Sequence, residues 1–344
     1  MTTINLSRPS SKPAVDPGER ESMPCPLCGL HTTAGEEPFL RGQDRLHDLP
    51  GEFTVVRCRR CRLLRTDPRP TPEAMAFYYP SDYGPYQSTR VTGPQIPPPS
   101  RAADGGGGPA VPWWKRAARA VFQFNIDRLP EIEPGRLLEI GCASGSFLRR
   151  MAARGWDAEG IEFSPEAAAA ARDLGFTVHA GSVEGAPDPE APYDLVVGWM
   201  VLEHLHDPVL ALRKLHRWTR PGGWLALSVP NAGAAEFRLF RDAWFALQVP
   251  THLFHYTPDT AAALLERGGW RTERVLHQRI LSNWIGSVGI VLKRHPATER
   301  LGKKLLGFTG RPTPLHFLLY PLAYLLSLGG QTGRMILWAR RIDG

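Results

Sequence analysis

From Trp113 onward, short apolar runs alternate with helical segments along the chain. Helices are predicted to begin at Ser146, Pro165 and Pro208, each after an apolar run. The predicted strands are residues 136–140, 158–161, 176–179, 195–199 and 224–229. Strands that alternate with helices are typical of right-handed βαβ units, which build a parallel sheet. The pattern therefore predicts a doubly wound α/β domain.

The pattern after residue 230 is less regular. A helix is predicted over 257–267, with Thr257 as its N-cap, and further strands are predicted over 271–276 and 335–339. Between these two strands lies a long insertion, roughly residues 281–332. The insertion interrupts the sheet pattern and needs an interpretation of its own.

Fourteen almost entirely apolar residues, 315–328, form the most unusual part of the insertion, and Pro321 lies near their middle. The run is shorter than the roughly 20 apolar residues that a membrane-spanning helix needs. An exposed apolar face of this size usually marks an interface. We favour burial in the core or beside a ligand pocket. Docking to an anionic membrane surface and dimerisation are the alternatives.

The N-terminal part of the chain divides into segments of different composition. Residues 1–22 are polar without an apolar period and are predicted to be disordered, and no secretory signal is visible among them. Residues 23–86 contain four cysteines. Residues 87–112 are rich in proline and glycine and predict a linker. The main domain then extends over 113–344.

Composition adds little to this division. The 344 residues suffice for two or three domains, and 42% hydrophobic and 22% charged residues are ordinary for a globular protein. The net charge of +7 suits an anionic partner, which can be nucleic acid, a phosphorylated substrate or an anionic membrane. The alternative is that the net charge reflects a solvated basic surface without a specific partner.

Four of the five cysteines form two CxxC pairs, and 29 residues separate the pairs. Two such pairs predict a tetrahedral four-sulfur zinc site that is structural, because four protein ligands leave no open position. The predicted metal ligands are Cys25, Cys28, Cys58 and Cys61. A redox disulfide pair is the alternative, and a DNA-binding finger is disfavoured because no recognition helix follows. Metal-binding cysteines indicate a reducing compartment, so we expect a cytoplasmic protein.

The segment 137–148 carries the candidate cofactor loop, in which an apolar strand runs into a glycine-bearing turn and a helix. Gly141 and Gly145 let the backbone approach a ligand closely. Glu139 precedes the loop, where a carboxylate suits an ammonium group and repels a pyrophosphate. Glu162 ends the next predicted strand, at the position where a two-pronged acceptor holds a ribose diol.

Several motifs resemble those of class I S-adenosylmethionine (SAM)-dependent methyltransferases. Residues 139–145 resemble motif I of that class, and 200–208 resemble the VLEHL-x-DP segment of a subfamily that includes quinone O-methyltransferases. Residues 220–223 and 229–231 resemble the turn before the fifth strand and the end of that strand. The resemblance implies a seven-stranded Rossmann-like sheet in the order 3-2-1-4-5-7-6, with SAM at the carboxyl ends of the first two strands.

The resemblance also implies a set of cofactor-binding residues. Ala143 stands where the family often has glycine, and Ser182 stands where many relatives have an acidic residue near the adenine. Adenine binding is therefore expected to rest on backbone groups of Ser182 and Val183. Cys142 is interpreted as a small loop residue, not a nucleophile. The complete set is Glu139, Gly141, Cys142, Ala143, Gly145, Glu162, Ser182 and Val183.

Three histidines are candidates for a general base that takes a proton from a hydroxyl acceptor. His204 follows the fourth predicted strand. His252 and His255 lie in a P-x-H-L-F-H-Y-T-P stretch that resembles a segment bordering the acceptor pocket in the subfamily. His252 and His255 are favoured as the base. The alternatives are a structural role, in which each imidazole bonds to backbone, and a metal pair.

Three functions are compatible with these features. The cysteine module resembles zinc-binding segments of methyltransferases from deoxysugar and polysaccharide biosynthesis, and residues 78–83 fit that pattern, so a sugar, nucleotide-sugar or glycan acceptor is favoured. The VLEHL segment and the apolar run support a quinone-like or lipid-linked acceptor. A non-catalytic nucleic-acid-binding protein is the third hypothesis, and the intact cofactor motif disfavours it. We expect no nucleic-acid partner. Peripheral contact with the inner face of the membrane through 315–328 stays open, as does the oligomeric state.

Overall fold

The computed structural model describes residues 18–30, 35–79, 122, 124–309 and 313–342. The expected linker at 87–112, residues 1–17 of the expected disordered N-terminus and residues 80–83 of the tyrosine-rich segment lie outside this range. Arg20–Glu21 form the short strand β1, and the Ser22 hydroxyl donates a hydrogen bond to Asp67 Oδ1 at 2.8 Å. The prediction that the disordered N-terminus extends to residue 22 is therefore wrong at its C-terminal end.

Seven of the described strands form one sheet in the order β12-β13-β10-β9-β6-β7-β8. They are β6 (Arg136–Ile140), β7 (Asp157–Glu162), β8 (Val178–Ala180), β9 (Tyr193–Trp199), β10 (Thr219–Pro230), β12 (Trp270–His277) and β13 (Arg334–Arg341). The pairs among β6 to β10 are parallel, whereas β13 runs antiparallel to both β10 and β12. In chain order this is 6-7-5-4-1-2-3, which confirms the predicted sheet.

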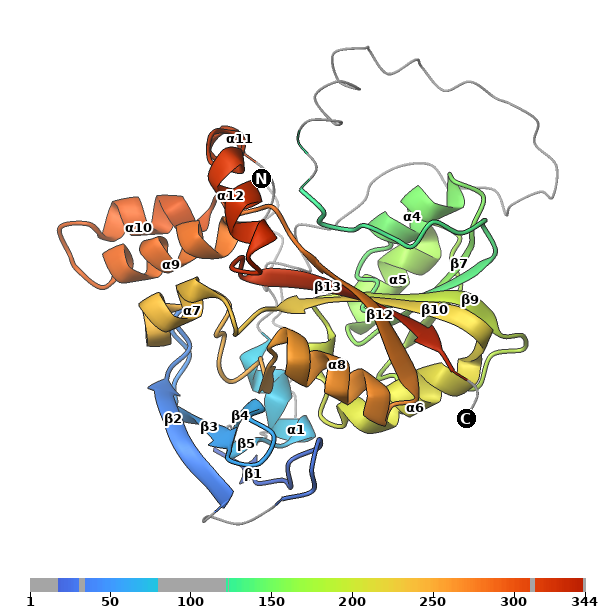
Figure 1. Cartoon of the computed structure of the whole chain (residues 1–344), viewed down its shortest axis with the longest axis horizontal. Helices are drawn as coiled ribbons and strands as arrows, with labels where there is room; N and C mark the ends of the chain where they lie inside the picture. Colours follow the sequence, from blue (N-terminus) through green and yellow to red (C-terminus); the bar gives the residue numbers. More distant parts are fainter. Residues whose placement is uncertain (1–17, 31–34, 80–121, 123, 310–312, 343–344) are drawn as a thin grey trace, which may run out of the picture.

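Helices cover both faces of the sheet (Figure 1). The helices α4 (Ser146–Ala152) and α5 (Pro165–Asp173) lie on one face, and α6 (Pro208–Trp218) and α8 (Pro258–Arg267) lie on the other. Alternate side chains of β6 pack to opposite sides, because successive side chains of a strand point to opposite faces. Leu137 belongs to the core with Phe147 of α4, whereas Leu138 belongs to the core with Leu212 of α6.

Local capping explains where three of these helices begin. The side chains of Ser164, Asp207 and Thr257 each accept a hydrogen bond from a backbone N–H in the first turn, and a proline follows each cap. Such caps satisfy backbone donors that the helix leaves unpaired, and proline at the first position loses nothing. The predicted starts of α5, α6 and α8 are therefore confirmed.

The cysteine segment folds into a small sheet that the main domain completes. Its strands are β2 (Glu36–Gly42), β3 (Phe53–Cys58) and β4 (Leu64–Thr66), and β11 (Phe254–His255) pairs with β4. The strand β1 pairs with β5 (Arg69–Pro70), and α1 (Pro72–Met75) and η2 (Ala76–Tyr78) follow. One continuous hydrophobic core joins the module to the main domain.

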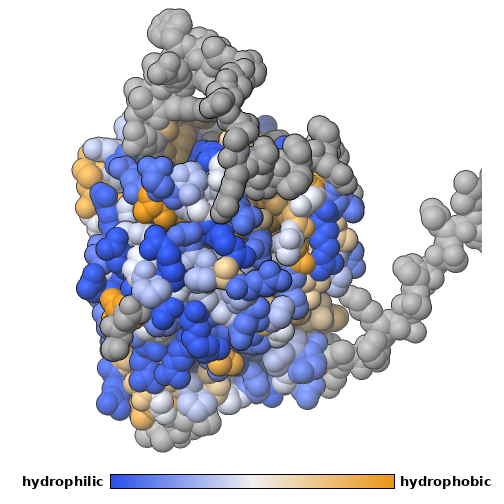
Figure 2. Space-filling model, turned by 90° about the vertical axis from the view of Figure 1, so that its right-hand side faces the viewer, coloured by the Kyte–Doolittle hydropathy of each residue, from blue (hydrophilic) through white to orange (hydrophobic). Residues whose placement is uncertain are grey.

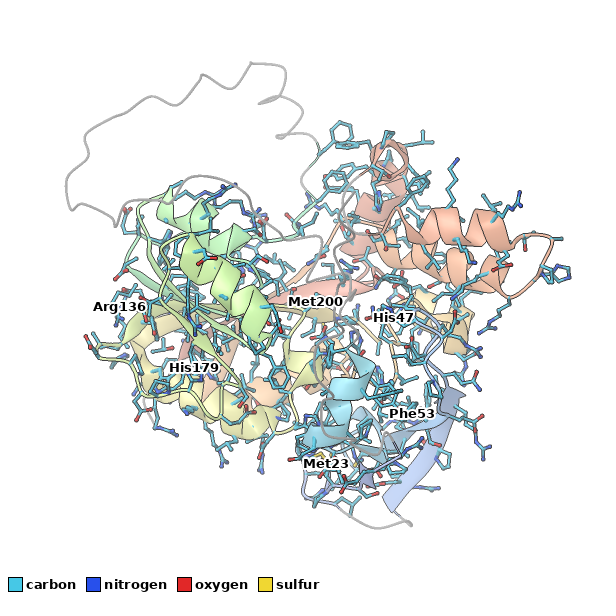
Figure 3. All side chains as sticks on the ribbon, turned by 180° about the vertical axis from the view of Figure 1, so that it is seen from behind. Met23, His47, Phe53, Arg136, His179 and Met200 are labelled. Carbon is cyan, nitrogen blue, oxygen red and sulfur yellow. The ribbon has the colours of Figure 1, made fainter. Side chains whose placement is uncertain are left out.

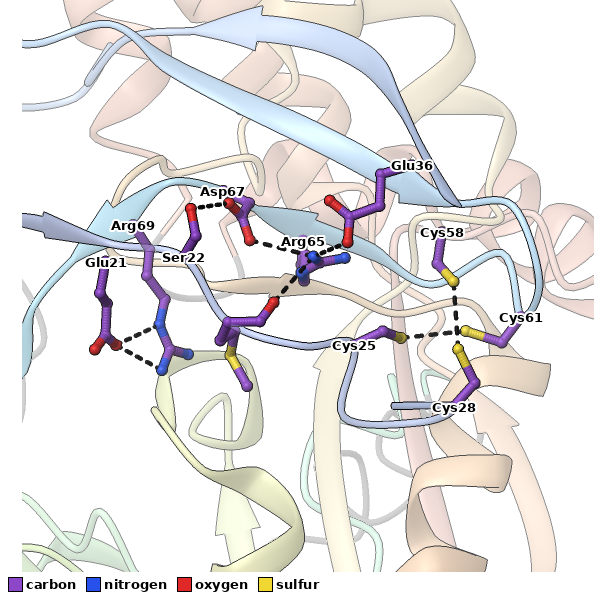
Figure 4. Close-up of polar contacts among 11 residues, drawn as sticks. Glu21, Ser22, Cys25, Cys28, Glu36, Cys58, Cys61, Arg65, Asp67 and Arg69 are labelled. Atoms are coloured by element: carbon purple, nitrogen blue, oxygen red, sulfur yellow. Dashed lines mark hydrogen bonds and ion pairs between the residues drawn. The ribbon is translucent and has the colours of Figure 1, made fainter. Parts of the chain in front are cut away.

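Arg65 of β4 lies at the centre of the module with only 1% of its surface exposed. Its guanidinium pairs with Glu36 and with Asp67, the latter at 3.2 Å, and it donates to the Met23 carbonyl oxygen at 3.1 Å (Figure 4). A buried charge is tolerated only when it is paired. This ion cluster therefore holds three separate parts of the module together.

The insertion forms four helices, α9 (Ser282–Lys293), α10 (Glu299–Leu306), α11 (Pro314–Leu318) and α12 (Tyr320–Leu328). The apolar run is divided between α11 and α12, and Pro321 lies in the first turn of α12. Leu318 is 76% exposed and Leu328 is 68% exposed. The favoured expectation that the run is buried is therefore wrong for its outer side. Within the described part of the chain, no helix has the length and apolarity to cross a membrane.

Two further short helices connect the sheet to α8. They are α7 (Ala235–Phe240) and η4 (Arg241–Ala243). A third short helix, η3 (Leu202–His204), follows β9. Met200 lies between β9 and η3, near the centre of the molecule in Figure 3. The module approaches the carboxyl end of β9, because the Tyr79 hydroxyl lies 2.9 Å from Nδ1 of His204 in η3.

We expect Arg65→Met to destabilise the protein by about 3–5 kcal/mol, because the substitution leaves Glu36 and Asp67 without their buried partner. Arg41→Met is the matched control, since Arg41 and Glu52 form a pair at 3.4 Å with side chains 76% and 54% exposed. An exposed pair contributes less than about 1 kcal/mol. Urea unfolding followed by circular dichroism measures both variants. If both variants lost the same small amount of unfolding free energy, the buried ion cluster would not be what holds the module together.

Candidate active site and metal centre

The predicted cofactor loop leaves β6 in a conformation that few residue types adopt. Gly141, Ala143 and Gly145 have positive φ angles of 69°, 46° and 80°. A Cβ atom on Gly141 would lie 2.6 Å from Val201 Cγ2, so only glycine fits there without movement. The N–H of Gly141 donates to the Ile161 carbonyl oxygen at 2.8 Å. The loop is thus bonded to the end of β7.

Two buried carboxylates flank this loop. Glu139 is 3% exposed, and burial raises its pKa well above the ordinary value. Its Oε2 has no hydrogen-bond partner among the residues described. Each unpaired buried carboxylate oxygen costs free energy, so Glu139 is suited to a ligand that brings a donor or a positive charge.

Glu162 ends β7 and is held by the loop itself. Its Oε2 accepts a hydrogen bond from the Ala143 N–H, and its Oε1 accepts one from the Ser164 N–H, each at 2.8 Å. Burial raises the pKa of Glu162. Each carboxylate oxygen can accept a second hydrogen bond, so both remain able to bind a diol. The structure therefore brings the predicted residues Glu139, Gly141 and Glu162 to one edge of the sheet.

The remaining predicted cofactor residues lie around the same edge. Cys142 is 3% exposed, and burial raises the pKa of its thiol, which agrees with a packing role. Ser182 follows β8, and its hydroxyl accepts a hydrogen bond from the Gly185 N–H at 3.2 Å. The Val183 side chain is 3% exposed, so any contact of this residue with adenine would involve its backbone. The adenine-binding role of Ser182 and Val183 stays a prediction.

The four cysteines of the module converge on one point (Figure 4). Cys25 Sγ lies 3.4 Å from Cys61 Sγ, and Cys28 Sγ lies 3.5 Å from Cys58 Sγ. All four sulfur atoms lie within 4.8 Å of one another, and none is in a disulfide. Tetrahedral zinc with Zn–S bonds of about 2.3 Å places its sulfur atoms about 3.8 Å apart. The donor set therefore fits zinc.

The two CxxC turns have the same backbone geometry. The N–H of Gly29 donates to the Cys25 carbonyl oxygen at 2.8 Å, and the N–H of Arg62 donates to the Cys58 carbonyl oxygen at 2.9 Å. Gly29 and Arg62 have φ angles of 70° and 67°. Burial raises the pKa of Cys25 to about 11. A bound cation favours the thiolate form and removes this cost.

His204 and His252 lie together near the end of β9, with ring centroids 4.7 Å apart. Nδ1 of His252 donates to the Ala246 carbonyl oxygen at 2.8 Å, which leaves a lone pair on Nε2. Nδ1 of His204 lies 2.9 Å from both the Thr251 carbonyl oxygen and the Tyr79 hydroxyl. Burial lowers the pKa of His204 to about 4 and that of His252 well below its ordinary value. Both imidazoles are therefore neutral.

His255 lies in β11, at the boundary between the module and the main domain. Its Nε2 is 3.4 Å from the Thr66 hydroxyl of β4, and this hydroxyl also donates to the His252 carbonyl oxygen at 2.9 Å. His255 is 1% exposed, and burial lowers its pKa to about 3. The structure thus brings the three predicted histidines into one region, but His255 contacts the module.

Glu203 was not singled out from the sequence, although it lies inside the VLEHL segment. It is fully buried, and neither carboxylate oxygen has a hydrogen-bond partner within the described chain. Burial raises its pKa to about 8. Three residues, Glu203, His204 and His252, each place one possible ligand atom within 4.8 Å of the other two. Such a set could also hold a divalent cation. Tyr79, which contacts His204, was also missed, because only folding brings it there.

A cavity of about 410 Å³ lies away from these residues, against the α6 side of β6 and β7. Three of its polar lining groups bond one another: Arg136 pairs with Glu159, and the Tyr193 hydroxyl donates to Glu159 at 3.0 Å. These groups are already satisfied, so we assign no site to this cavity.

The sheet order and the two carboxylates at the ends of β6 and β7 agree with the Rossmann-like methyltransferase fold that the sequence motifs predict. Residues 113–275, just under half of the chain, match the family model described as a methyltransferase domain. The match identifies residues 113–275 as a methyltransferase domain.

Curated relatives carry related names. The chain is 32% identical over 130 residues to a malonyl-acyl-carrier-protein O-methyltransferase from Serratia marcescens. The aligned region covers 37% of this chain and 50% of the relative. It is 29% identical over 145 residues to a ubiquinone biosynthesis O-methyltransferase from Paracidovorax citrulli, covering 37% of this chain and 60% of the relative. The chain thus spans 50–60% of the length of these two relatives.

Other similarities are longer but weaker. A ubiquinone biosynthesis O-methyltransferase from Pseudomonas aeruginosa is 24% identical over 220 residues, covering 60% of this chain and 84% of the relative. A solved SAM-dependent methyltransferase from Mesorhizobium loti is 19% identical and superposes with a TM-score of 0.40. The superposition covers 66% of this chain and 96% of the Mesorhizobium loti chain. The curated names support the predicted resemblance to quinone O-methyltransferases.

We expect the purified protein to contain one zinc ion per chain, and Cys58→Ser to lose it, because three thiolates and a hydroxyl no longer form the four-sulfur set. Elemental analysis of both proteins measures the metal. Cys142→Ser is the control, since Cys142 lies outside the cluster and should leave the zinc content unchanged. If the wild-type protein contained no metal and its mass spectrum showed two disulfides, the zinc site would be excluded and the redox disulfide interpretation would take its place.

Proposed function

We propose that the protein transfers the methyl group of SAM to a hydroxyl acceptor. The observation that carries the proposal is the pair of buried carboxylates around the 141–145 loop, Glu139 with a free Oε2 and Glu162 with both oxygens oriented by backbone N–H groups. Glu139 would hold the ammonium group of the cofactor, and Glu162 would hold its ribose hydroxyls. SAM would supply an electrophilic methyl group.

The contribution of the chain to such a reaction is alignment and proton removal. Methyl transfer is an in-line displacement, so the acceptor oxygen must be held in line with the sulfur–methyl bond. A neutral imidazole near the end of β9 could accept the hydroxyl proton as the oxygen attacks. Among the three candidate histidines His204 is the most accessible, because its side chain is partly exposed whereas His252 and His255 are 2% and 1% exposed.

The acceptor is proposed to be quinone-like or lipid-linked. The names of the relatives described above refer to ubiquinone biosynthesis and to an acyl carrier protein, and none of these names refers to a sugar. A sugar, nucleotide-sugar or glycan acceptor was favoured from the cysteine module, and it is now the second candidate. Release of S-adenosylhomocysteine in the presence of a hydroxylated quinone or a nucleotide-sugar distinguishes the two acceptor classes.

We expect Glu162→Ala to weaken SAM binding by roughly 10- to 150-fold, because the variant loses hydrogen bonds to a charged group worth about 1.5–3 kcal/mol. Isothermal titration calorimetry measures the dissociation constant. Glu166→Ala is the matched control, since Glu166 is an exposed carboxylate on α5 and should leave SAM binding unchanged. An unchanged dissociation constant in folded Glu162→Ala would remove Glu162 from the cofactor site.

We expect His204→Gln to lower kcat by about 10²-fold or more while the dissociation constant of SAM stays the same, because the variant lacks the proton acceptor. Since burial lowers the pKa of His204 to about 4, the wild-type rate should fall only as the pH drops towards about 4, where the imidazole becomes protonated. His295→Gln, at an exposed position, is the control. A wild-type acid limb near pH 6.5, or full activity of His204→Gln, would exclude His204 as the base.

A further inference from the structure

Exposed apolar side chains are concentrated in the insertion. Of the 15 large hydrophobic residues that are exposed in the described part of the chain, nine lie within 281–332. On α11 and α12 the outward side consists of Leu318, Leu322, Leu325 and Leu328, which are 76%, 50%, 64% and 68% exposed. These four leucines are here called the leucine face. Neither helix contains a charged residue of the Asp, Glu, Lys or Arg type.

The opposite side of the same helices is firmly attached to the protein. His316 Nε2 lies 3.0 Å from the Ser282 hydroxyl of α9, and His316 is 1% exposed. Phe317 and Tyr320 each pack edge to face on Phe122, with ring centroids 5.2 and 5.1 Å apart. The leucine face is therefore held outward by packing on its other side, and its exposure is a property of the folded protein.

Positive charge is concentrated in the same insertion. Residues 281–332 contain six lysines and arginines and one acidic residue, a net charge of 6 − 1 = +5, out of +7 for the whole chain. Lys293 and Arg294 pair with Asp48 and Asp242, which lie outside the insertion, at 2.7 and 2.6 Å, and Lys303 of α10 pairs with Glu299 at 2.6 Å. Arg300 and Lys304 are exposed on the same helix, and neither has an ion-pair partner within the described residues. A leucine face and unpaired cations within one insertion are typical of a segment that binds anionic lipid.

The helices α9–α12 are grouped on one side of the molecule, away from α6 and the C-terminus (Figure 1). Figure 2 shows the opposite side, which is mostly hydrophilic with only scattered hydrophobic residues. The insertion, which carries the leucine face and the unpaired cations of α10, therefore lies opposite a mostly hydrophilic side of the molecule. This asymmetry is what a protein lying on a bilayer requires.

We propose that the leucine face and the cations of α10 dock the protein on an anionic lipid bilayer. Self-association through this surface is less suitable, because a symmetric contact would bring together two insertions whose cations Arg300 and Lys304 have no ion-pair partner among the described residues. A bilayer that contains anionic lipid accepts both the leucines and the cations. The inference goes beyond methyl transfer and does not rest on it.

Docking at this surface would place the acceptor side of the sheet close to the membrane. Asn283 in the first turn of α9 accepts a hydrogen bond from Arg334 Nε at 3.0 Å, and Arg334 is the first residue of β13. The insertion is therefore continuous with the ends of the strands near which the candidate base lies. A lipid-linked acceptor could reach the site without leaving the bilayer.

Flotation of the full chain with vesicles tests the proposal. The vesicles contain phosphatidylcholine alone or phosphatidylcholine with phosphatidylglycerol. The wild type should float with the anionic vesicles only, and added salt should reduce the bound fraction. Leu322→Glu with Leu325→Glu should lower binding by about tenfold or more, since two apolar contacts become charged. Arg300→Glu with Lys304→Glu should abolish the preference for anionic lipid.

Leu210→Glu on α6 is the matched control, because Leu210 is 47% exposed outside the insertion and should float like the wild type. All substituted positions are exposed, so circular dichroism should show folded variants, and SAM binding should be unchanged in each. Failure of the wild type to float with anionic vesicles would overturn the proposal. The proposal would also be overturned if the wild type were a dimer and the double variant Leu322→Glu with Leu325→Glu were a monomer that bound vesicles as well as the wild type does.

Discussion

The pairing of β4 with β11 is the contact on which the arrangement of the candidate active site depends. Phe254 pairs with Arg65, and His255 pairs with Leu64, so a strand of the main domain completes the sheet of the cysteine module. The Thr66 hydroxyl then donates to the His252 carbonyl oxygen. The backbone that presents His252 is consequently held from the module side. A zinc ion at the four cysteines would rigidify β3 and β4, and it would thereby support the histidines without taking part in chemistry.

Burial of charge is the second constraint on the structure. Arg65 is buried with two carboxylate partners that compensate its charge, although its Nε and Nη1 have no hydrogen-bond partner in the described structure. Glu139 and Glu203, in contrast, are buried with carboxylate oxygens that have no partner in the described structure. An unpaired buried acceptor destabilises the protein unless a ligand binds it. A ligand that donated to these oxygens of Glu139 and Glu203 would remove this cost.

The insertion is an addition to the sheet that lies apart from the predicted cofactor edge. The sheet has the strand order expected from the motifs, and α9–α12 lie between its last two strands in sequence, β12 and β13. The addition leaves the cofactor edge at β6 and β7 untouched. It places the exposed leucine face in helices that adjoin the start of β13 instead. The proposed cofactor site and the proposed membrane-docking surface thus involve separate parts of the fold.

The sequence by itself determined the alternation of strands and helices, the capped helix starts and the carboxylates at Glu139 and Glu162, because each depends on residues that are close along the chain. The sheet order was implied by the resemblance of the motifs to a known family. Only the tertiary structure decided that β11 joins the module, that Glu203 lies near His252 and Tyr79 beside His204, and that the apolar run is exposed. Thr66 and His252 are 186 positions apart, and no local pattern specifies such a contact. Hydrophobic periodicity shows that a side chain needs an apolar environment. Whether the protein interior or a lipid surface provides it is decided by the packing of distant segments.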